Sequence, residues 1–331
     1  MRRKEAALRG GLAGSLATLM VVMAAPGACA QNLKAWRQAM IAPKADAGFF
    51  LMAAKRGFAE QEGLKIEVVD VKDDQVGMRA LISGQVDSFD SATGGVVAAA
   101  RGADLKFVGC SWLAVPYVVL GRAGLSKMDE LKGRTIAASA PGTPPDIVAR
   151  ASLAAFQVPD QDIKFAAIGS DRDRYNALIG GIVDAAVVAN EYTPLPSSKN
   201  LNLLAEARQV LPQWIRFCTL MNGQALAARH DDAVKFLSAQ IKAFRYAVAH
   251  REETIRLTQE ATDAAPDDPR PAYVFDEGVK PGVVAPEFPL PVENLDWMRD
   301  KLAALGQIPK TDLARTFDAQ LRLQALERVD K

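Results

Sequence analysis

The chain has 331 residues, of which 49% are hydrophobic and 24% charged, and its 40 basic and 39 acidic residues leave a formal net charge of +1. A chain of this length and composition suits two globular domains or lobes with ample core. The balanced charge argues against the broad basic surface that a nucleic acid or an anionic membrane would require of its partner.

Residues 1–30 are predicted to be a signal peptide. A basic stretch over residues 2–9 precedes an apolar stretch over residues 12–25, and Ala28-Cys29-Ala30 forms a small-x-small cleavage site. Cleavage there removes four basic residues and one acid, so that 36 basic and 38 acidic residues leave a charge of −2. A lipid anchor on Cys29 is the alternative, which Pro26 disfavours because lipoprotein signals carry an aliphatic residue there.

Strand and helix patterns then alternate along the chain. In the first part we expect strands at 35–41, 66–71, 86–90 and 105–112, and helices at 47–62, 75–83 and 94–101. In the second part we expect strands at 135–139, 163–168, 183–188, 201–204 and 215–221, and helices at 144–156, 172–180, 231–250, 252–260, 292–305 and 311–327. A Pro- and Asp-rich segment at 263–290 is expected to be irregular, with a short helix near 272–276. This alternation predicts an α/β fold with parallel sheets covered on both faces.

An internal repeat divides the chain. Residues 66–95 align without a gap with residues 163–192, at a constant offset of 97, and both copies carry Ala-Leu-Ile, then Gly, then Val-Asp in step. Asp74 and Asp171 suit the N-terminal ends of the two helices, and Gly84 and Gly181 suit left-handed caps at their C-terminal ends. Any two βαβ units look somewhat alike, which is the alternative explanation. A duplication at this spacing predicts two similar lobes.

The repeat also predicts which loops face each other, because ligands of open parallel sheets bind at the carboxyl ends of the strands. Loops 91–94 and 189–192 are equivalent and would meet across one cleft. Their candidate ligand-binding residues are Ser91, Ala92, Thr93, Asn190, Glu191 and Tyr192. Ser91 and Thr93 have helix capping as their alternative role, and Tyr192 has packing beneath the turn.

Two further loops belong to the same edge. Pro141, Gly142 and Thr143 precede a predicted helix whose free N–H groups would favour an anionic group. The corresponding loop of the first lobe carries Lys44 and Asp46, and Lys44 either pairs with an acidic solute or stays solvated.

Three aromatic residues are candidates for the wall of the cleft. Phe49 and Phe50 are consecutive on a predicted helix, so that one is expected in the core and the other at the cleft. Trp112 ends a strand and would provide a stacking surface for a ring.

Several phrases of the sequence point to a family. They lie at 55–64 (KRGFAEQEGL), 80–87, 99–104, 128–137, 139–143 and 177–184. In these phrases the chain resembles the periplasmic solute-binding proteins of ABC importers, in the NMT1/SsuA-like group that includes sulfonate, nitrate and thiamine-precursor receptors. The resemblance covers most of residues 33–220.

The resemblance implies a type II periplasmic binding fold, with two parallel-rich sheets joined by two crossing hinge strands at 113–120 and 215–222. Lobe 1 would comprise residues 31–114 and 220–331, and lobe 2 residues 115–219. It further implies a periplasmic monomer without cofactor or metal that closes on a solute and delivers it to an ABC permease of the inner membrane. In this topology Cys218 would approach Cys110, which leaves a disulfide and two buried thiols as alternatives.

The expected solute is a sulfonate, an aromatic or organic acid, or a pyrimidine. Nitrate is less favoured, since Asp46-Ala47-Gly48-Phe49 replaces the apolar-aromatic run of many relatives and no arginine is assigned to the cleft. A pyrimidine- or quinone-precursor enzyme on the same fold is one alternative. It is disfavoured because His230 and His250, the two histidines, are expected away from the cleft and no metal-ligand spacing occurs. A receptor that feeds a sensor or another carrier is the other alternative.

Overall fold

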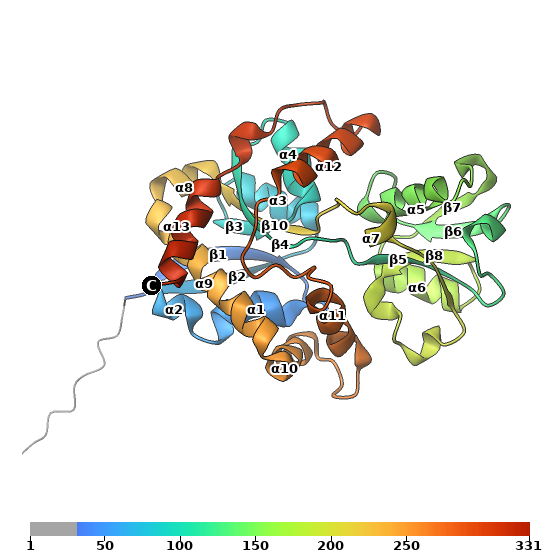
Figure 1. The fold of residues 1–331 in the computed structure, drawn as a ribbon, viewed down its shortest axis with the longest axis horizontal. Helices are drawn as coiled ribbons and strands as arrows, with labels where there is room; N and C mark the ends of the chain where they lie inside the picture. Colours follow the sequence, from blue (N-terminus) through green and yellow to red (C-terminus); the bar gives the residue numbers. More distant parts are fainter. Residues whose placement is uncertain (1–31) are drawn as a thin grey trace, which may run out of the picture. The chain divides into compact units, whose positions relative to one another are not determined.

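The computed structural model describes residues 32–331, so that the predicted signal peptide lies outside the described residues. Two five-stranded sheets form the centres of two lobes (Figure 1). The first sheet has the order β2-β1-β3-β10-β4 and the second β7-β6-β8-β5-β9. The strands of the first are β1 (Lys34–Ile41), β2 (Leu64–Val71), β3 (Ser88–Asp90), β4 (Leu105–Trp112) and β10 (Phe217–Asn222). Those of the second are β5 (Tyr117–Gly121), β6 (Thr135–Ala138), β7 (Lys164–Ala167), β8 (Ala185–Ala189) and β9 (Asn202–Glu206).

Both sheets are mixed and follow the same plan. Strand β1 is parallel to β2 and β3, as β6 is to β7 and β8. The fourth strand of each sheet, β10 or β5, is antiparallel to both of its neighbours. Each of these two strands directly follows a segment that has come from the other lobe. This crossing of the chain confirms the predicted two-lobed fold.

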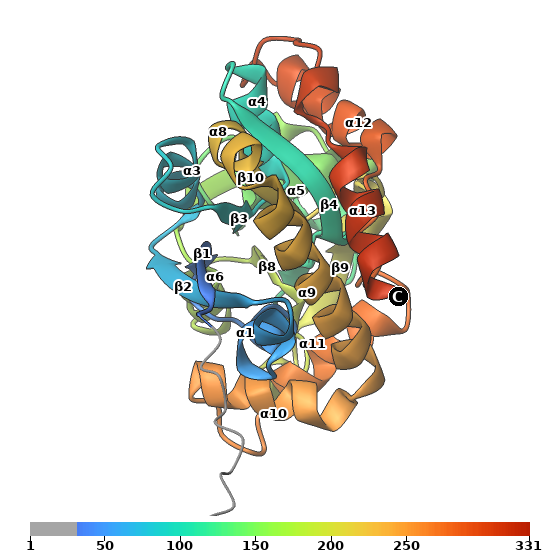
Figure 2. The same cartoon turned by 90° about the vertical axis from the view of Figure 1, so that its left-hand side faces the viewer.

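Helices cover the sheets of both lobes. The first lobe carries α1 (Ala47–Lys55), α2 (Phe58–Gln61), α3 (Asp74–Ile82), α4 (Thr93–Ala100), α8 (Gly223–Ala228), α9 (His230–Ala249), α10 (Arg251–Thr262), α11 (Pro269–Val279), α12 (Val292–Ala304) and α13 (Ala319–Val329). The second carries α5 (Pro144–Ala155), α6 (Asp171–Ile179) and α7 (Ala207–Val210). The long helix α9 packs against α13 (Figure 2) and buries an apolar face around Phe236 and Phe244.

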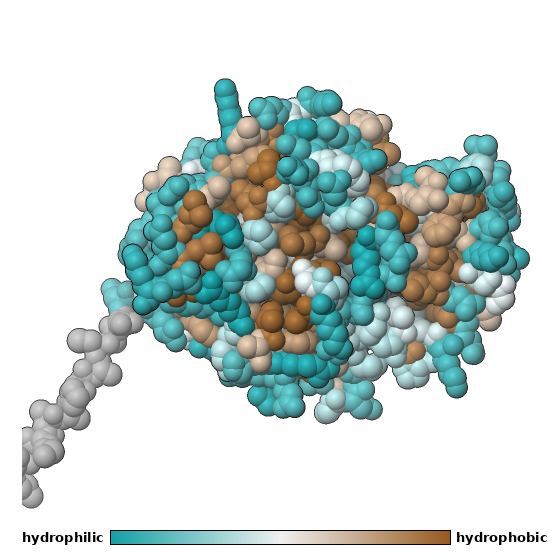
Figure 3. All heavy atoms as spheres, viewed as in Figure 1, coloured by the Kyte–Doolittle hydropathy of each residue, from teal (hydrophilic) through white to brown (hydrophobic). Residues whose placement is uncertain are grey.

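Hydrophilic residues are interspersed with apolar patches on the face drawn in Figure 3. In residues 32–331, no helix combines the length and the apolar character that crossing a membrane requires.

Three predicted helices needed correction. The helix expected at 47–62 is divided into α1 and α2 at Gly57, whose φ of +76° is left-handed. The helix expected at 311–327 begins only at Ala319, because the Asp318 side chain caps it at Leu321 N (3.0 Å) and a 3₁₀ turn precedes it. The short helix near 272–276 is the longer α11, capped by Asp268.

The internal repeat corresponds to equivalent structure. Helices α3 and α6 begin and end 97 residues apart, and each is followed by a glycine, Gly84 or Gly181, with φ of +71°. Asp74 and Asp171 lie in the first turns of these helices, which confirms their predicted place at the N-terminal ends. The side chains that cap the two helices are those of the preceding residues, Asp73 and Ser170.

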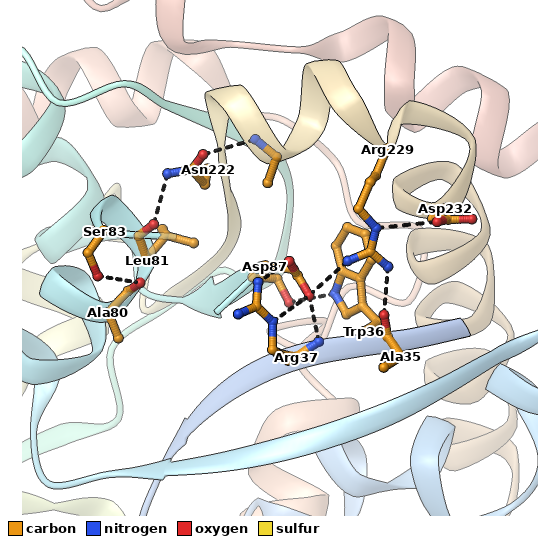
Figure 4. A network of polar contacts seen from close by, with 12 residues as sticks. Ala35, Trp36, Arg37, Ala80, Leu81, Ser83, Asp87, Asn222, Arg229 and Asp232 are labelled. Carbon is orange, nitrogen blue, oxygen red and sulfur yellow. Dashed lines mark hydrogen bonds and ion pairs between the residues drawn. The ribbon is translucent and has the colours of Figure 1, made fainter. Parts of the chain in front are cut away.

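The repeated Val-Asp pair has a structural role in both lobes. The Asp87 carboxylate accepts hydrogen bonds from Arg37 N and Arg37 Nη2, both at 2.8 Å, and pairs with Arg229 at 3.2 Å (Figure 4). The equivalent Asp184 accepts from Thr135 N at 2.9 Å and pairs with Arg122 at 2.9 Å. In each lobe the aspartate thus ties the loop before β3 or β8 to the neighbouring strand.

Exchanging Asp87 for asparagine is expected to lower the free energy of unfolding by about 2 kcal/mol at pH 7. Burial raises the pKa of Asp87, but the hydrogen bonds from Arg37 and the charge of Arg229 outweigh burial and hold this pKa below its ordinary value. The stabilisation is therefore complete above about pH 3.9 and is lost as the pH falls through the lower pKa of the folded state. Urea titrations at neutral pH and at pH 3 measure the difference in the free energy of unfolding between the wild type and the Asp87→Asn variant. Asp70→Asn, at an exposed position, is the control. A difference between wild type and Asp87→Asn that does not shrink in acid would contradict this role.

A disulfide joins Cys110 of β4 to Cys218 of β10, and so decides between the two alternatives for these cysteines. The two residues face each other in the antiparallel ladder and are fully buried. The two cysteines are 108 residues apart in the chain, and all five strands of the second sheet lie between them.

Candidate ligand-binding cleft

A cavity of about 1220 Å³ lies where the carboxyl ends of β1, β3 and β8 meet. Residues of both lobes line it: Gln38 to Ala47 from β1 and its following loop, Phe89 and Asp90 from β3, and Ala189 from β8. Parallel strands place their carboxyl ends at one edge of a sheet, and the two sheets present this edge to the same space. The cavity is therefore the candidate ligand-binding cleft.

Seven of the candidate residues from the sequence line this cleft. They are Lys44, Asp46, Ser91, Thr93, Thr143, Glu191 and Tyr192. They come from the four loops that the repeat and the strand order predicted to meet. Thr93 and Ser91 also have structural partners, since Thr93 Oγ1 accepts from Trp214 Nε1 (3.0 Å) and Ser91 Oγ from Gly94 N (3.1 Å).

Three other candidates belong to the core. Phe49, Ala92 and Trp112 are at most 2% exposed and do not line the cleft. Phe49 packs against Trp112 and Phe275, with ring centroids 5.6 and 5.4 Å away. Consecutive helical residues face different ways, so that the neighbouring Phe50 lines the cleft instead.

The remaining candidates, Pro141, Gly142 and Asn190, also lie outside the lining. Asn190 faces a separate small pocket beside Tyr273. Gly142 has a left-handed φ of +80° and donates its N–H to Asp146 Oδ2 at 2.9 Å. This N–H of the loop before α5 is thus already bonded to a carboxylate of the protein itself, and Pro144 and Pro145 at the start of α5 have no N–H to offer an anion.

Several cleft residues escaped the sequence analysis. They include Gln38, Asp74, Asp90, Tyr117, Asp171, Arg174, Arg216 and Arg270. Asp90 ends a predicted strand and Asp74 and Asp171 match in the repeat, so that these three carried a usable signal. The arginines carried none, and their presence corrects the expectation that no arginine could be assigned to the cleft.

The cations of the cleft interior are paired with acids. The Arg216 guanidinium contacts Asp46 at 2.5 Å and lies over the Phe217 ring at 4.4 Å. Lys44 Nζ lies 3.2 Å from Asp171 Oδ2 and so connects the two lobes. Burial lowers the pKa of Lys44, but Asp171, Tyr117 and Glu191 together outweigh burial and raise this pKa above its ordinary value.

Two further arginines are neutralised in the same way. Arg174, which is 1% exposed, pairs with Asp171 at 2.5 Å and donates to the carbonyl oxygens of Ile168, Gly169 and Val187. Arg270 pairs with Asp268 at 2.5 Å. The buried cationic groups of the cleft are therefore engaged by the protein.

Five carboxyl groups of the cleft lining form no ion pair within the described chain, and two of them, Asp73 and Asp173, are exposed. The three that are not exposed are Asp74, Asp90 and Glu191. Asp90 Oδ1 accepts from Thr219 Oγ1 at 2.6 Å, and its Oδ2 accepts from Gln38 Nε2 at 3.0 Å. Glu191 accepts from Ala45 N at 3.3 Å, across the cleft. Burial raises the pKa of each of the three above its ordinary value.

Comparison with known proteins gives a family and a fold. Residues 44–254 match the family model described as NMT1/THI5 like, whereas none of the curated proteins compared matches the chain. The periplasmic aliphatic sulphonate binding protein SsuA from Escherichia coli is 18% identical, with a TM-score of 0.67 over 87% of this chain and 91% of SsuA. The periplasmic nitrate-binding protein NrtA from Synechocystis is 14% identical, with a TM-score of 0.71 over 90% and 89% of the two chains.

A DszB mutant in complex with biphenyl-2-sulfinic acid is also similar, at 14% identity and a TM-score of 0.67 over 89% of this chain and 100% of DszB. At such identities the structures share the fold with this chain. The family model, by contrast, covers well over half of the sequence. The chain therefore belongs to the NMT1/THI5-like family and has the two-lobed fold of periplasmic solute-binding proteins.

Proposed function

We propose that this protein binds a small organic solute between its lobes in the periplasm and delivers the solute to an ABC importer. The observation that carries the proposal is the cavity at the carboxyl ends of both sheets, which is lined by loops of both lobes. Clefts of this kind, with apolar walls and a few convergent polar groups, are the usual form of small-molecule sites.

The connections between the lobes support closure as the mechanism. Within residues 32–331, the chain passes between the two lobes only at 113–116, between β4 and β5, and at 211–216, between α7 and β10. Since β10 lies wholly in the first sheet, we place the return crossing before Phe217 rather than at 219–220. Two contacts then form when the lobes approach each other: the ion pair of Lys44 with Asp171, and the hydrogen bond from Ala45 N to Glu191.

The cleft residues favour binding over catalysis. No histidine or cysteine lines the cavity, and Cys110 and Cys218 are joined to each other. His230 and His250 lie at the two ends of α9, outside the cleft lining. Histidine, the commonest general base, and a free cysteine thiol are thus missing from the described lining, which leaves its carboxyl, hydroxyl and amino groups for binding.

A solute that binds the folded state is expected to raise the thermal midpoint of the protein by several degrees, because a hundredfold excess over Kd contributes about 2.7 kcal/mol. Differential scanning fluorimetry against small-molecule libraries measures the midpoint, and small-angle scattering measures the accompanying decrease in the radius of gyration. Thr143→Trp places a large ring in the cleft and should abolish both responses. Gln161→Trp, at an exposed position outside the lining, should preserve them. A solute that raises the thermal midpoint of the Thr143→Trp variant as much as that of the wild type would contradict binding in the cleft.

A further inference from the structure

The charges that line the cleft are unequal. The lining carries eight acidic residues, Asp46, Asp73, Asp74, Asp90, Asp171, Asp173, Glu191 and Asp268, against six basic ones, Lys44, Lys72, Arg172, Arg174, Arg216 and Arg270. Lys72 and Arg172 have exposed side chains at the rim. The other four basic residues pair with Asp46, Asp171 or Asp268. Each of these four cations is thus already paired with a carboxylate, with which an anionic solute would have to compete or share the cation.

Asp90 is the acid whose surroundings are most informative. It ends β3, and its two oxygens accept hydrogen bonds from the neutral groups of Thr219 on β10 and Gln38 on β1. Gln38 in turn accepts a hydrogen bond at 3.1 Å from Gln240 of α9. This chain of neutral side chains fixes the position of the carboxylate but supplies no positive charge. A buried carboxylate is costly unless a cation compensates it.

Asp74 and Glu191 extend the same pattern to both sides of the cleft. The carboxyl group of Asp74, in the first turn of α3, lies against the Ser91 hydroxyl and the backbone of Gly94, where a Cβ on Gly94 would be 2.3 Å from Asp74 Oδ2. Glu191 follows β8 on the opposite lobe. Apart from the exposed Asp73 and Asp173, the cleft thus holds two carboxyl groups on one lobe and one on the other without an ion pair for any of them.

We propose, on the basis of the proposed function, that the solute is a small organic cation whose ammonium, amidinium or protonated ring nitrogen is bound by Asp90, with Asp74 and Glu191 completing the negative surface. The rings of Phe50, Tyr117 and Tyr192 line the same cleft and would bind the apolar part of such a cation or contact its charge by their faces. Closing the lobes then brings Glu191 toward a charge that Asp90 already holds, which couples binding to closure.

The proposal predicts a pH dependence of binding. Asp90 is faced by the neutral groups of Gln38 and Thr219. Asp74 lies near Ser91 and Asp73. Glu191 lies near the charges of Lys44, Asp46, Asp171 and Arg216. Burial raises the pKa of Asp90, Asp74 and Glu191 above the ordinary carboxyl values of about 3.9 to 4.3. Affinity for a cation should therefore fall as the pH is lowered from 7 through these raised pKa values, because protonated carboxyls no longer attract it.

The test uses the mature protein and probes that differ mainly in charge. Benzylammonium and choline are compared with benzyl alcohol, benzoate and benzenesulfonate by scanning fluorimetry and calorimetry. In parallel, a deproteinised bacterial small-molecule extract is separated on cation and anion exchangers, and each fraction is assayed for its thermal shift. A shift from the cationic probes or the cation-exchanger fraction supports the proposal.

The other outcomes separate this proposal from the proposed function. A shift only from neutral or anionic probes, or only from the anion-exchanger or unbound fraction, retains solute binding but overturns the cationic class. No shift from any probe or fraction counts against both.

Asp90→Asn provides the matched variant. We expect it to weaken binding of the cation at least tenfold, a loss of about 1.4 kcal/mol, and to flatten the pH dependence. Its thermal midpoint without solute should equal or exceed that of the wild type, since the replaced carboxylate has no cation in the described structure. Asp70→Asn, exposed on β2, serves as the control and should bind normally. Unchanged affinity of Asp90→Asn for the cation would overturn the assignment.

Discussion

Replacing Gly48 with alanine is expected to lower the free energy of unfolding by about 3 kcal/mol, at the upper end of the usual cost of overpacking. Gly48 lies where α1 meets α10, and a Cβ there would be 2.2 Å from the backbone oxygen of Thr254 and 2.6 Å from Thr258 Oγ1. Gly48 N also donates to Thr258 Oγ1 at 2.9 Å, so that the two helices would have to separate and weaken this bond. Because the contact involves backbone, no rotation of a side chain relieves it.

Denaturant unfolding measures this cost, and Gly169→Ala is the matched control because no atom lies within 4 Å of its added Cβ. The control should stay within about 0.5 kcal/mol of the wild type. The same substitution at Gly48 should also weaken solute binding, since α1 carries Phe50 into the cleft and follows Asp46. A Gly48→Ala protein as stable as the control would show that the helices adjust without cost.

Removing the disulfide with the double substitution Cys110→Ala and Cys218→Ala is expected to lower the free energy of unfolding by about 4 kcal/mol. The bond closes a loop of 108 residues that holds the entire second lobe, so that it greatly restricts the unfolded chain. Both cysteines are fully buried between β4 and β10, and their loss also removes packing in the first lobe.

The entropic part can be separated from the packing part by reducing the wild type under denaturing conditions with dithiothreitol. Reduced wild type keeps both sulfur atoms and should lose most, but not all, of the stability that the double variant loses. Dithiothreitol should leave the double variant unchanged. Equal unfolding of the oxidised and reduced wild type would contradict a stabilising role of the bond.

The repeat at an offset of 97 residues carried most of the successful prediction. It placed α3 and α6, the two left-handed glycines and the loops that contribute Ser91 and Glu191 to the cleft. It did so because each βαβ unit is specified by residues close together in the chain, where periodicity and turn residues are visible. The same local signals failed at Gly57 and Asp318, where one left-handed residue or one capping side chain changes a helix boundary.

By itself the sequence determined the α/β class, the two lobes and the edge at which a ligand would bind, since these follow from local patterns and the strand-end rule. Only the tertiary structure decided which charges remain for a ligand. Lys44 and its partner Asp171 are 127 residues apart in the chain. Arg216, just before β10, pairs with Asp46, which follows β1 near the start of the described chain. Whether Asp90 lacks a cation depends on every residue packed around it, and burial and ion pairing are properties of the folded chain that no local pattern records.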